Sequence, residues 1–177
     1  YDPYSNSKSC SELVTSSYRS SFLDGRGVAA STARAGNVIG GGDFAAGRII
    51  PDCVRAVRTG NPIQIRNPFS VRPYQHVLEP LSAYLLIAHR QYDDAKVAGS
   101  YNVGPDSRDC ITTGELADLF CRSWGGDARW EHVGDEGPHE DQVLRLDCSK
   151  IQRDLGWTPR WHTDCAVEET VASVSYT

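Results

Sequence analysis

A chain of 177 residues is long enough to bury a real hydrophobic core, in one domain or in one and a half. Its 40% hydrophobic and 23% charged residues are typical of a globular protein, and no apolar run approaches the ~18 residues of a membrane span. The formal net charge of −5 argues against general binding to nucleic acids. The six cysteines form no C-x-x-C pair and no zinc-finger spacing, which favours the reduced thiols of a cytoplasmic protein over a metal site.

The first eight residues carry the most specific chemical signal. Asp2 followed by Pro3 predicts a helix start, because a carboxylate caps free N–H groups and proline is pre-set for the first helical position. Tyr4 and Lys8 then lie one turn apart on one face of that helix. A phenol is a poor base at neutral pH, but a neighbouring ammonium group favours the phenolate and makes a tyrosine usable as a proton shuttle. A solvated Tyr–Lys pair on a helix surface explains the spacing equally well, although the chain has only three lysines.

The elements expected after this helix follow the order of a parallel α/β sheet. Glycines close the helix, an apolar run of strand length follows, and a glycine-rich loop comes next. Ligands of such sheets bind beyond the carboxyl ends of the strands. The expected helices cover 3–22, 48–59, 79–92, 112–124, 149–155 and a last segment from 164; the expected strands cover 28–34, 62–66, 71–77 and 100–104; the expected loops cover 35–43 and 127–141.

Two of these helices are expected to have an apolar side, and a third has a well-marked start. The apolar sides consist of Leu13, Val14, Tyr18 and Phe22 in the first helix, and of Leu81, Leu85 and Ala88 in the helix over 79–92. Thr112 is expected to cap the helix that follows it, with Glu115 at the third helical position bonding back in a capping box.

Two further stretches favour a small anionic ligand, each with a plainer alternative. Between Arg48 and Arg72 there are five arginines and one acidic residue, which suits a diphosphate because planar guanidinium groups bind it well. A helix and a hairpin with solvated arginines explain this stretch at least as well. The glycine run at 40–42 is no G-x-G-x-x-G fingerprint, and on spacing alone it predicts a flexible loop.

Motifs along the whole chain resemble one known family. They are Asp-Pro-Tyr-Ser-x-Ser-Lys (2–8), Arg-Ala-Gly-Asn-Val-Ile-Gly-Gly-Gly-Asp (34–43), Arg-Ile-Ile-Pro-Asp (48–52), Arg-Pro-Tyr-Gln-His-Val-Leu-Glu-Pro (72–80), Tyr-Asn-x-Gly-Pro (101–105), Leu-Asp-Cys-Ser-Lys (146–150) and Leu-Gly-Trp-x-Pro-Arg-Trp (155–161). Together they are similar to the C-terminal half of the extended short-chain dehydrogenases/reductases, and within these to the 4,6-dehydratases that act on CDP-glucose. The Tyr-x-x-x-Lys pair is common to that superfamily, whereas the triple glycine and the 72–80 motif are specific to this branch.

The resemblance implies an enzyme that dehydrates a nucleotide sugar with bound NAD. In such enzymes NAD oxidises C4 of the glucose, water leaves across C5–C6 and the hydride returns to C6, so that CDP-glucose becomes CDP-4-keto-6-deoxyglucose. Tyr4 would then take the proton of the C4 hydroxyl and Lys8 would hold the cofactor ribose. Arg34 would lie among the cofactor contacts.

The resemblance also implies a set of substrate contacts. Asn37 would contact the sugar or its phosphate, and Arg72 would clamp the diphosphate. Ile50 and Pro51 would line the pocket of the base, and His139 is a further candidate for the neighbourhood of the diphosphate.

The implied organisation is the C-terminal part of a doubly wound, Rossmann-like parallel sheet interleaved with a smaller α/β substrate domain. Residues 1–45 would end the NAD-binding domain, 46–177 would mostly bind the sugar nucleotide, and about 79–104 would return to the Rossmann core. The family's N-terminal half, with its pyrophosphate loop and further catalytic residues, is expected upstream of Tyr1. The isolated chain is therefore expected to be inactive and to bind NAD weakly or not at all. Similar enzymes form homodimers through a bundle that includes the Tyr-x-x-x-Lys helix.

Two alternatives stay open. A related NAD-dependent epimerase or decarboxylase of sugar nucleotides would keep the Tyr–Lys pair but release a product whose mass differs from that of the dehydration product. A non-catalytic module that binds sugar nucleotides would not need the phenol at all.

Overall fold

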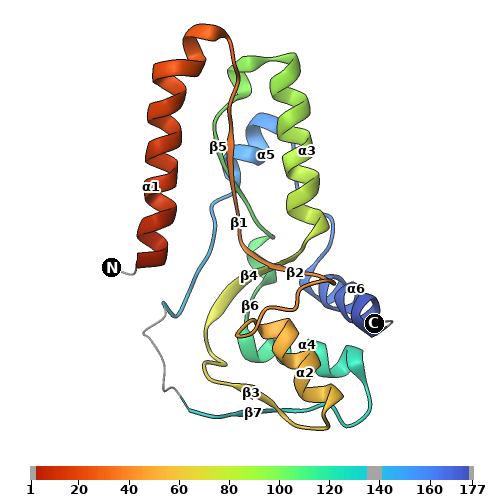
Figure 1. The fold of residues 1–177 in the computed structure, drawn as a ribbon. Coiled ribbons are helices and arrows are strands. Elements are labelled where there is room, and N and C mark those ends of the chain that lie inside the picture. The colour runs from red at the N-terminus through yellow and green to blue at the C-terminus, as the bar shows by residue number, and fades with distance from the viewer. Residues whose placement is uncertain (1–2, 135–140, 176–177) are drawn as a thin grey trace.

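The computed structural model describes residues 3–134 and 141–175 of the chain (Figure 1). The helices are α1 (Pro3–Tyr18), α2 (Ile49–Arg58), α3 (Leu78–Asp93), α4 (Thr113–Trp124), α5 (Ser149–Leu155) and α6 (Thr163–Ser175). The strands are β1 (Thr32–Ala35), β2 (Asn37–Ile39), β3 (Ile63–Ile65), β4 (Val71–His76), β5 (Ser100–Val103), β6 (Cys110–Thr112) and β7 (Trp130–His132). A π-helical turn, Arg19–Leu23, and a 3-10 turn, Asp24–Arg26, follow α1.

The upper region in Figure 1 consists of β1, β5, α1, α3 and α5. β1 and β5 pair in parallel, with α1 on one side of them and α3 and α5 on the other (Figure 1). The buried residues of this region are Ala83, Ile87, Tyr101, Val103, Cys148, Ile151, Leu155 and Trp157. They come from β5, α3, α5 and the residues on either side of α5, so the packed apolar face of β1–β5 is the one turned away from α1.

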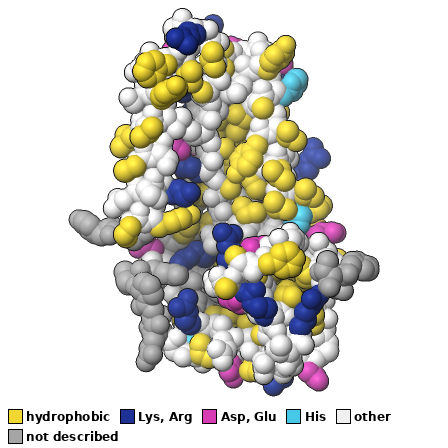
Figure 2. Space-filling model, viewed as in Figure 1, with side chains coloured by type: hydrophobic (Ala, Val, Ile, Leu, Met, Phe, Trp, Pro, Cys, Tyr) yellow, Lys and Arg dark blue, Asp and Glu magenta, His cyan; other side chains and the backbone are white. Residues whose placement is uncertain are grey.

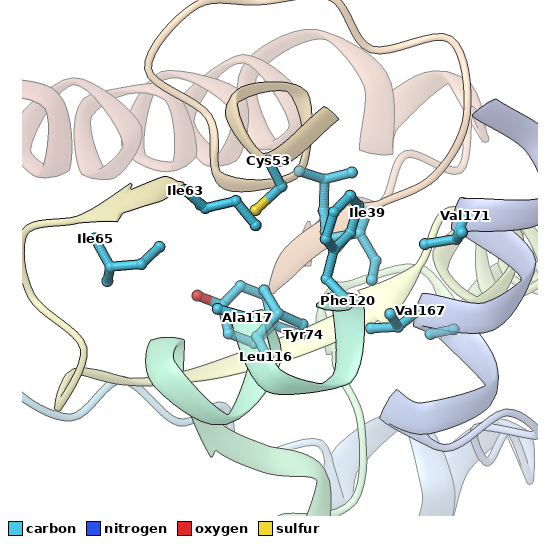
Figure 3. Close-up of a cluster of buried hydrophobic side chains, with 12 residues drawn as sticks. Ile39, Cys53, Ile63, Ile65, Tyr74, Leu116, Ala117, Phe120, Val167 and Val171 are labelled. Atoms are coloured by element: carbon cyan, nitrogen blue, oxygen red, sulfur yellow. The ribbon is translucent and has the colours of Figure 1, made fainter. Parts of the chain in front are cut away.

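The lower region consists of α2, α4, α6 and two small sheets. β4 pairs in parallel with β2 and antiparallel with β6, and β3 pairs in parallel with β7. Helices α2, α4 and α6 pack around these strands and enclose a second core (Figure 3). Its buried residues are Ile39, Ile50, Cys53, Ile63, Ile65, Tyr74, Leu116, Ala117, Phe120, Ala166, Val167 and Val171.

The two regions meet where β1 runs into β2. Gly36 separates these strands, and a Cβ atom at this position would lie 2.7 Å from the carbonyl oxygen of Pro73, so only glycine fits without a shift of the backbone. Gln75 of β4 donates a hydrogen bond of 3.0 Å to the carbonyl oxygen of Val103 at the end of β5. This bond connects the lower sheet to the upper one. The boundaries proposed for the two domains stay a prediction.

Several local expectations are confirmed. Helix α5 spans the expected residues, and strands β3, β4 and β5 lie within the stretches that the sequence pattern indicated. Thr112 accepts a hydrogen bond from the backbone N–H of Glu115, whose carboxylate accepts one from the N–H of Thr112, which completes the capping box. Hydrogen bonding to Thr112 holds the pKa of the Glu115 carboxyl below its usual value. In the described part of the chain, no helix is long and apolar enough to cross a membrane.

The two stretches that were expected to be loops each contain a strand. Residues 35–43 include β2, and residues 127–141 include β7. Both strands have only three residues, and they pair with strands far away in the sequence, β4 and β3. Glycine and charged residues dominate these stretches, so a strand of three residues leaves no recognisable pattern of alternating apolar residues in the sequence.

The apolar sides of two helices are exposed in the structure. In α3, Leu81 and Leu85 are 45% and 74% exposed, whereas the side that includes Ala83 and Ile87 is buried. In α1 no residue is buried, and Leu13 is 71% exposed. Figure 2 shows hydrophobic side chains gathered on the surface of the upper region as a result.

Candidate active site

The Tyr–Lys pair lies at the start of α1. The ammonium nitrogen of Lys8 is 5.4 Å from the centroid of the Tyr4 ring, a cation–π distance that the spacing of one helical turn produces. Tyr4 is 71% exposed. Helix α1 runs opposite to β1, so its N-terminal end lies level with the carboxyl end of that strand (Figure 1). The pair thus stands at the edge of the sheet where ligands of parallel sheets bind.

Glu12 connects the same helix to both strands. Its carboxylate oxygen Oε2 accepts hydrogen bonds from the hydroxyls of Thr32 on β1 (2.9 Å) and Ser100 on β5 (3.2 Å). Its other oxygen, Oε1, lies 3.5 Å from a guanidinium nitrogen of Arg34. The sequence reading did not identify Glu12, although its position one turn after Lys8 was a usable signal.

Arg34, expected among the cofactor contacts, is bonded within the sheet. Besides its ion pair with Glu12, its Nε donates a hydrogen bond of 2.8 Å to the side-chain oxygen of Asn102 on β5. Asn102 in turn donates through Nδ2 to the carbonyl oxygen of Asp147. A cofactor role for Arg34 stays a prediction, and in this structure its contacts are to protein.

The described residues among the predicted substrate contacts all lie in the lower region. Two are on the strands β2 and β4, and two are at the start of α2. Asn37 opens β2 opposite Tyr74 of β4, and Arg72 lies two residues earlier on β4 with a guanidinium hydrogen bond of 2.9 Å to the carbonyl oxygen of Val71. Both side chains are half-buried. Ile50 and Pro51, predicted to line the base pocket, are buried at the start of α2, and Ile50 belongs to the lower core. His139 lies outside the described residues.

The 72–80 motif makes structural contacts that the sequence reading did not foresee. Gln75 bonds to β5 as described above. The ring of His76 packs against that of Trp161 with centroids 4.9 Å apart, and burial lowers the pKa of this histidine. The buried carboxylate of Glu79 accepts hydrogen bonds from the backbone N–H groups of Arg160 (3.1 Å) and Trp161 (3.0 Å). The motif therefore attaches β4 and α3 to the 155–161 motif.

The arginine-rich stretch is largely engaged in local contacts. Arg48 lies 3.5 Å from Asp43, and Arg55 pairs with Asp52. Arg58 donates a hydrogen bond of 2.9 Å to the carbonyl oxygen of Val174 in α6. For three of the five arginines, these contacts agree with the alternative that the stretch is an ordinary surface helix and hairpin, with no need of an anionic ligand.

A cluster of Asp106, Asp109 and His162 brings together groups that could ligate a metal. Nε2 of His162 lies 2.6 Å from a guanidinium nitrogen of Arg108. Since arginine can only donate, Nε2 accepts and the hydrogen is on Nδ1, which donates to the carboxylate of Asp109 at 2.9 Å. The other oxygen of Asp109 accepts from the N–H of Thr163 at the start of α6. The cluster thus caps a helix.

Comparisons with known proteins decide the family. Residues 1–104 match the NAD dependent epimerase/dehydratase family. The chain belongs to this family. It is 49% identical over 167 residues to a CDP-glucose 4,6-dehydratase of Salmonella typhimurium, an alignment that covers 91% of this chain and 46% of that protein. The chain therefore spans about half the length of this curated relative.

Solved structures of dehydratases and epimerases share the fold. A dTDP-glucose 4,6-dehydratase of Bacillus anthracis in complex with NAD superimposes with a TM-score of 0.83 and 20% identity, over all of this chain and 53% of that one. A UDP-glucose-4-epimerase of Stenotrophomonas maltophila with bound NAD gives a TM-score of 0.80 and 19% identity, over 99% of this chain and 55% of that one. The expectation of a Rossmann-like α/β fold with parallel strands is confirmed.

Proposed function

We propose that the protein to which this chain belongs is an NAD-dependent 4,6-dehydratase that converts CDP-glucose to CDP-4-keto-6-deoxyglucose and water. The observation that carries the proposal is the Tyr4–Lys8 pair at the carboxyl edge of the β1–β5 sheet, in a chain 49% identical to a CDP-glucose 4,6-dehydratase. An acid–base residue beside a cation is what oxidation of a sugar hydroxyl requires.

The donors on α1 fit a dinucleotide. The hydroxyl of Tyr4 and the ammonium group of Lys8 lie on one helix face, where they can bond to the hydroxyls of a ribose and of a sugar. NAD, when bound, would accept the hydride from C4 of the sugar and later return that hydride to C6. Tyr4, acting as a phenolate, takes the proton of the C4 hydroxyl as the hydride leaves C4, and Lys8 stabilises that phenolate by its positive charge and orients the ribose.

The substrate contacts are part of the same proposal. Asn37 and Arg72 lie on the adjacent strands β2 and β4, so an amide and a guanidinium group are available on one sheet for the sugar and the diphosphate. Ile50 and Pro51 would contribute to the base pocket from the start of α2, and His139 stays a candidate for the diphosphate.

The test uses the full-length protein and the masses of the products. We would incubate it with NAD and, separately, with CDP-, dTDP-, UDP- and GDP-glucose. Loss of one water from CDP-glucose alone is the expected result. Loss of water from another nucleotide sugar would keep the reaction and change the substrate. An unchanged mass with all four, from a folded protein, would favour the epimerase or the non-catalytic binding module.

A tyrosine variant separates the dehydratase from a binding module. We expect Tyr4→Phe to reduce the oxidation of the sugar by roughly 10²–10⁴-fold, the usual contribution of an acid–base residue. Tyr92→Phe is the matched control, because Tyr92 lies on α3 and is 90% exposed. Unchanged turnover in Tyr4→Phe would show that the phenol has no catalytic role.

We further propose a cytoplasmic homodimer that associates through α1. The support is the exposed apolar side of this helix and of the π-helical turn after it. Leu13, Val14 and Tyr18 of the helix and Phe22 of the turn are 52–71% exposed. Sedimentation of the full-length protein should give a dimer, and Val14→Glu should produce monomers. A monomer in the unsubstituted protein would refute this part of the proposal.

A further inference from the structure

The face of the β1–β5 sheet that is turned toward α1 is polar. Thr32 and Arg34 lie on one face of β1 because side chains alternate along a strand, and their register partners on β5 are Ser100 and Asn102. The opposite face bears Tyr101 and Val103, which belong to the upper core. Helix α1 therefore lies over a row of hydroxyl, guanidinium and amide groups.

Glu12 is the residue of α1 that bonds to this row. Its carboxylate contacts Thr32, Ser100 and Arg34, and the side chain is 25% exposed. Because α1 has no buried residue, apolar packing in this chain does little to fix its position against the strands. Glu12 instead gives this helix charge-assisted, directional contacts to both strands.

The bonds of Glu12 continue into three other motifs of the sequence. Arg34 opens the 34–43 motif, Asn102 belongs to 101–105, and Asp147 belongs to 146–150. Glu12 contacts Arg34, Arg34 donates to Asn102, and Asn102 donates to the carbonyl oxygen of Asp147. One chain of polar contacts thus runs from α1 through both strands to the segment before α5.

Glu12 also lies on the same helix face as the proposed catalytic pair. Tyr4, Lys8 and Glu12 are spaced by four residues each, so they follow one another along one side of α1. Any rotation or sliding of the helix at Glu12 therefore moves the phenol and the ammonium group with it. Both carboxylate oxygens of Glu12 are engaged with the strands, while Lys8 faces the ring of Tyr4.

We propose that the Glu12–Arg34 pair is a positioning device that sets where Tyr4 and Lys8 stand relative to the carboxyl ends of β1 and β5. The inference rests on the proposed function of Tyr4 and Lys8. Glu12 and Arg34 touch neither substrate nor cofactor in this role. They act through the helix, and a small displacement of reacting groups is enough to slow a reaction greatly.

The test measures chemistry and binding separately in the full-length enzyme. In a single turnover with NAD and CDP-glucose, Glu12→Ala should slow the formation of reduced nicotinamide by roughly a hundredfold, the cost of a displacement of about 1 Å. The KM for CDP-glucose should change little. Glu12→Gln keeps an acceptor for the two hydroxyls and should recover part of the rate. Ser11→Ala is the control, because the Ser11 hydroxyl bonds to the carbonyl oxygen of Ser7 within α1.

Coupling between the two residues supplies a second measurement. Arg34→Ala should slow the same step. The double variant, Glu12→Ala with Arg34→Ala, should be no slower than the slower of the two single variants, because both substitutions remove the same ion pair. Hydrogen exchange of the α1 amides should rise in Glu12→Ala and stay unchanged in Ser11→Ala. If Glu12→Ala fails to fold, Thr32→Val removes one hydroxyl donor with little change of shape and should give a smaller loss of the same kind.

The outcomes distinguish this inference from the proposed function. If Tyr4→Phe abolishes oxidation while Glu12→Ala and Thr32→Val retain the full rate, the positioning role is wrong and the dehydratase proposal stands. If Tyr4→Phe itself retains activity, the catalytic assignment fails first. A Glu12→Ala enzyme that loses substrate affinity but keeps its rate would also refute positioning.

Discussion

The two regions of the molecule are held together in different ways. In the lower region, α2, α4 and α6 enclose twelve buried residues among the described ones. In the upper region one face of β1–β5 packs against α3 and α5, while the other face is polar and carries α1 through Glu12. The helix with the proposed catalytic pair is therefore the least buried large element. Its placement depends on a few directional bonds, whereas the lower region is fixed by close packing.

The largest expected effect comes from truncating the same residue type in each region. Leu116 of α4 is fully buried and Leu13 of α1 is 71% exposed. We expect Leu116→Ala to reduce the free energy of unfolding of this chain by about 2–5 kcal/mol, the cost of a cavity and of lost apolar burial. Leu13→Ala should change it by less than about 0.5 kcal/mol, as is usual for surface substitutions. Denaturant unfolding followed by circular dichroism measures both.

The variants Leu13→Ala and Leu116→Ala can also be compared in the full-length protein. If another part of the protein or a second copy covers α1, Leu13→Ala becomes costly there and stays neutral in the 177-residue chain. Equal costs for Leu13→Ala and Leu116→Ala in the short chain would contradict the difference between the two regions.

A smaller effect is expected at the junction of the regions. A methyl group on Gly36 would meet the carbonyl oxygen of Pro73 at 2.7 Å, and this backbone atom cannot rotate away. We expect Gly36→Ala to cost about 1–3 kcal/mol, the usual range for overpacking. Gly25→Ala is the control, since a Cβ atom there has no neighbour within 4 Å. A Gly36→Ala chain as stable as the control would show that the junction can widen.

The smallest expected effect concerns the pH dependence of stability. Burial lowers the pKa of His76, against the opposing charges of Glu169 and Glu79. As the pH falls through ~6.5, the histidine of the unfolded chain takes up a proton that the folded state resists. The free energy of unfolding should therefore decrease below that pH until the lower pKa of the folded state is reached. His76→Gln should flatten this decrease in a pH series of denaturant unfolding, and an unchanged slope would exclude His76 as its source.

Local features of the fold could be read from the sequence because their causes are local. The capping box at Thr112 and the bounds of α5 depend on residues within one or two turns. β2 and β7 could not be found in this way, since three residues carry almost no periodicity and the strands exist through distant partners. The buried side of α3 could not be identified from the sequence for a related reason. Periodicity identifies an apolar side, but which side is buried depends on what lies beside the helix.

The sequence by itself determined the chemistry that this chain can offer. The spacing of Tyr4 and Lys8 places a phenol and an ammonium group one helical turn apart, because an α-helix has a fixed pitch. Only the tertiary structure decided what holds that pair in place. Thr32, Arg34 and Ser100 come within bonding distance of Glu12 because β1 and β5 pair in parallel and bring segments 68 residues apart into register. Such a meeting depends on the packing of the whole chain, which no single stretch of residues encodes.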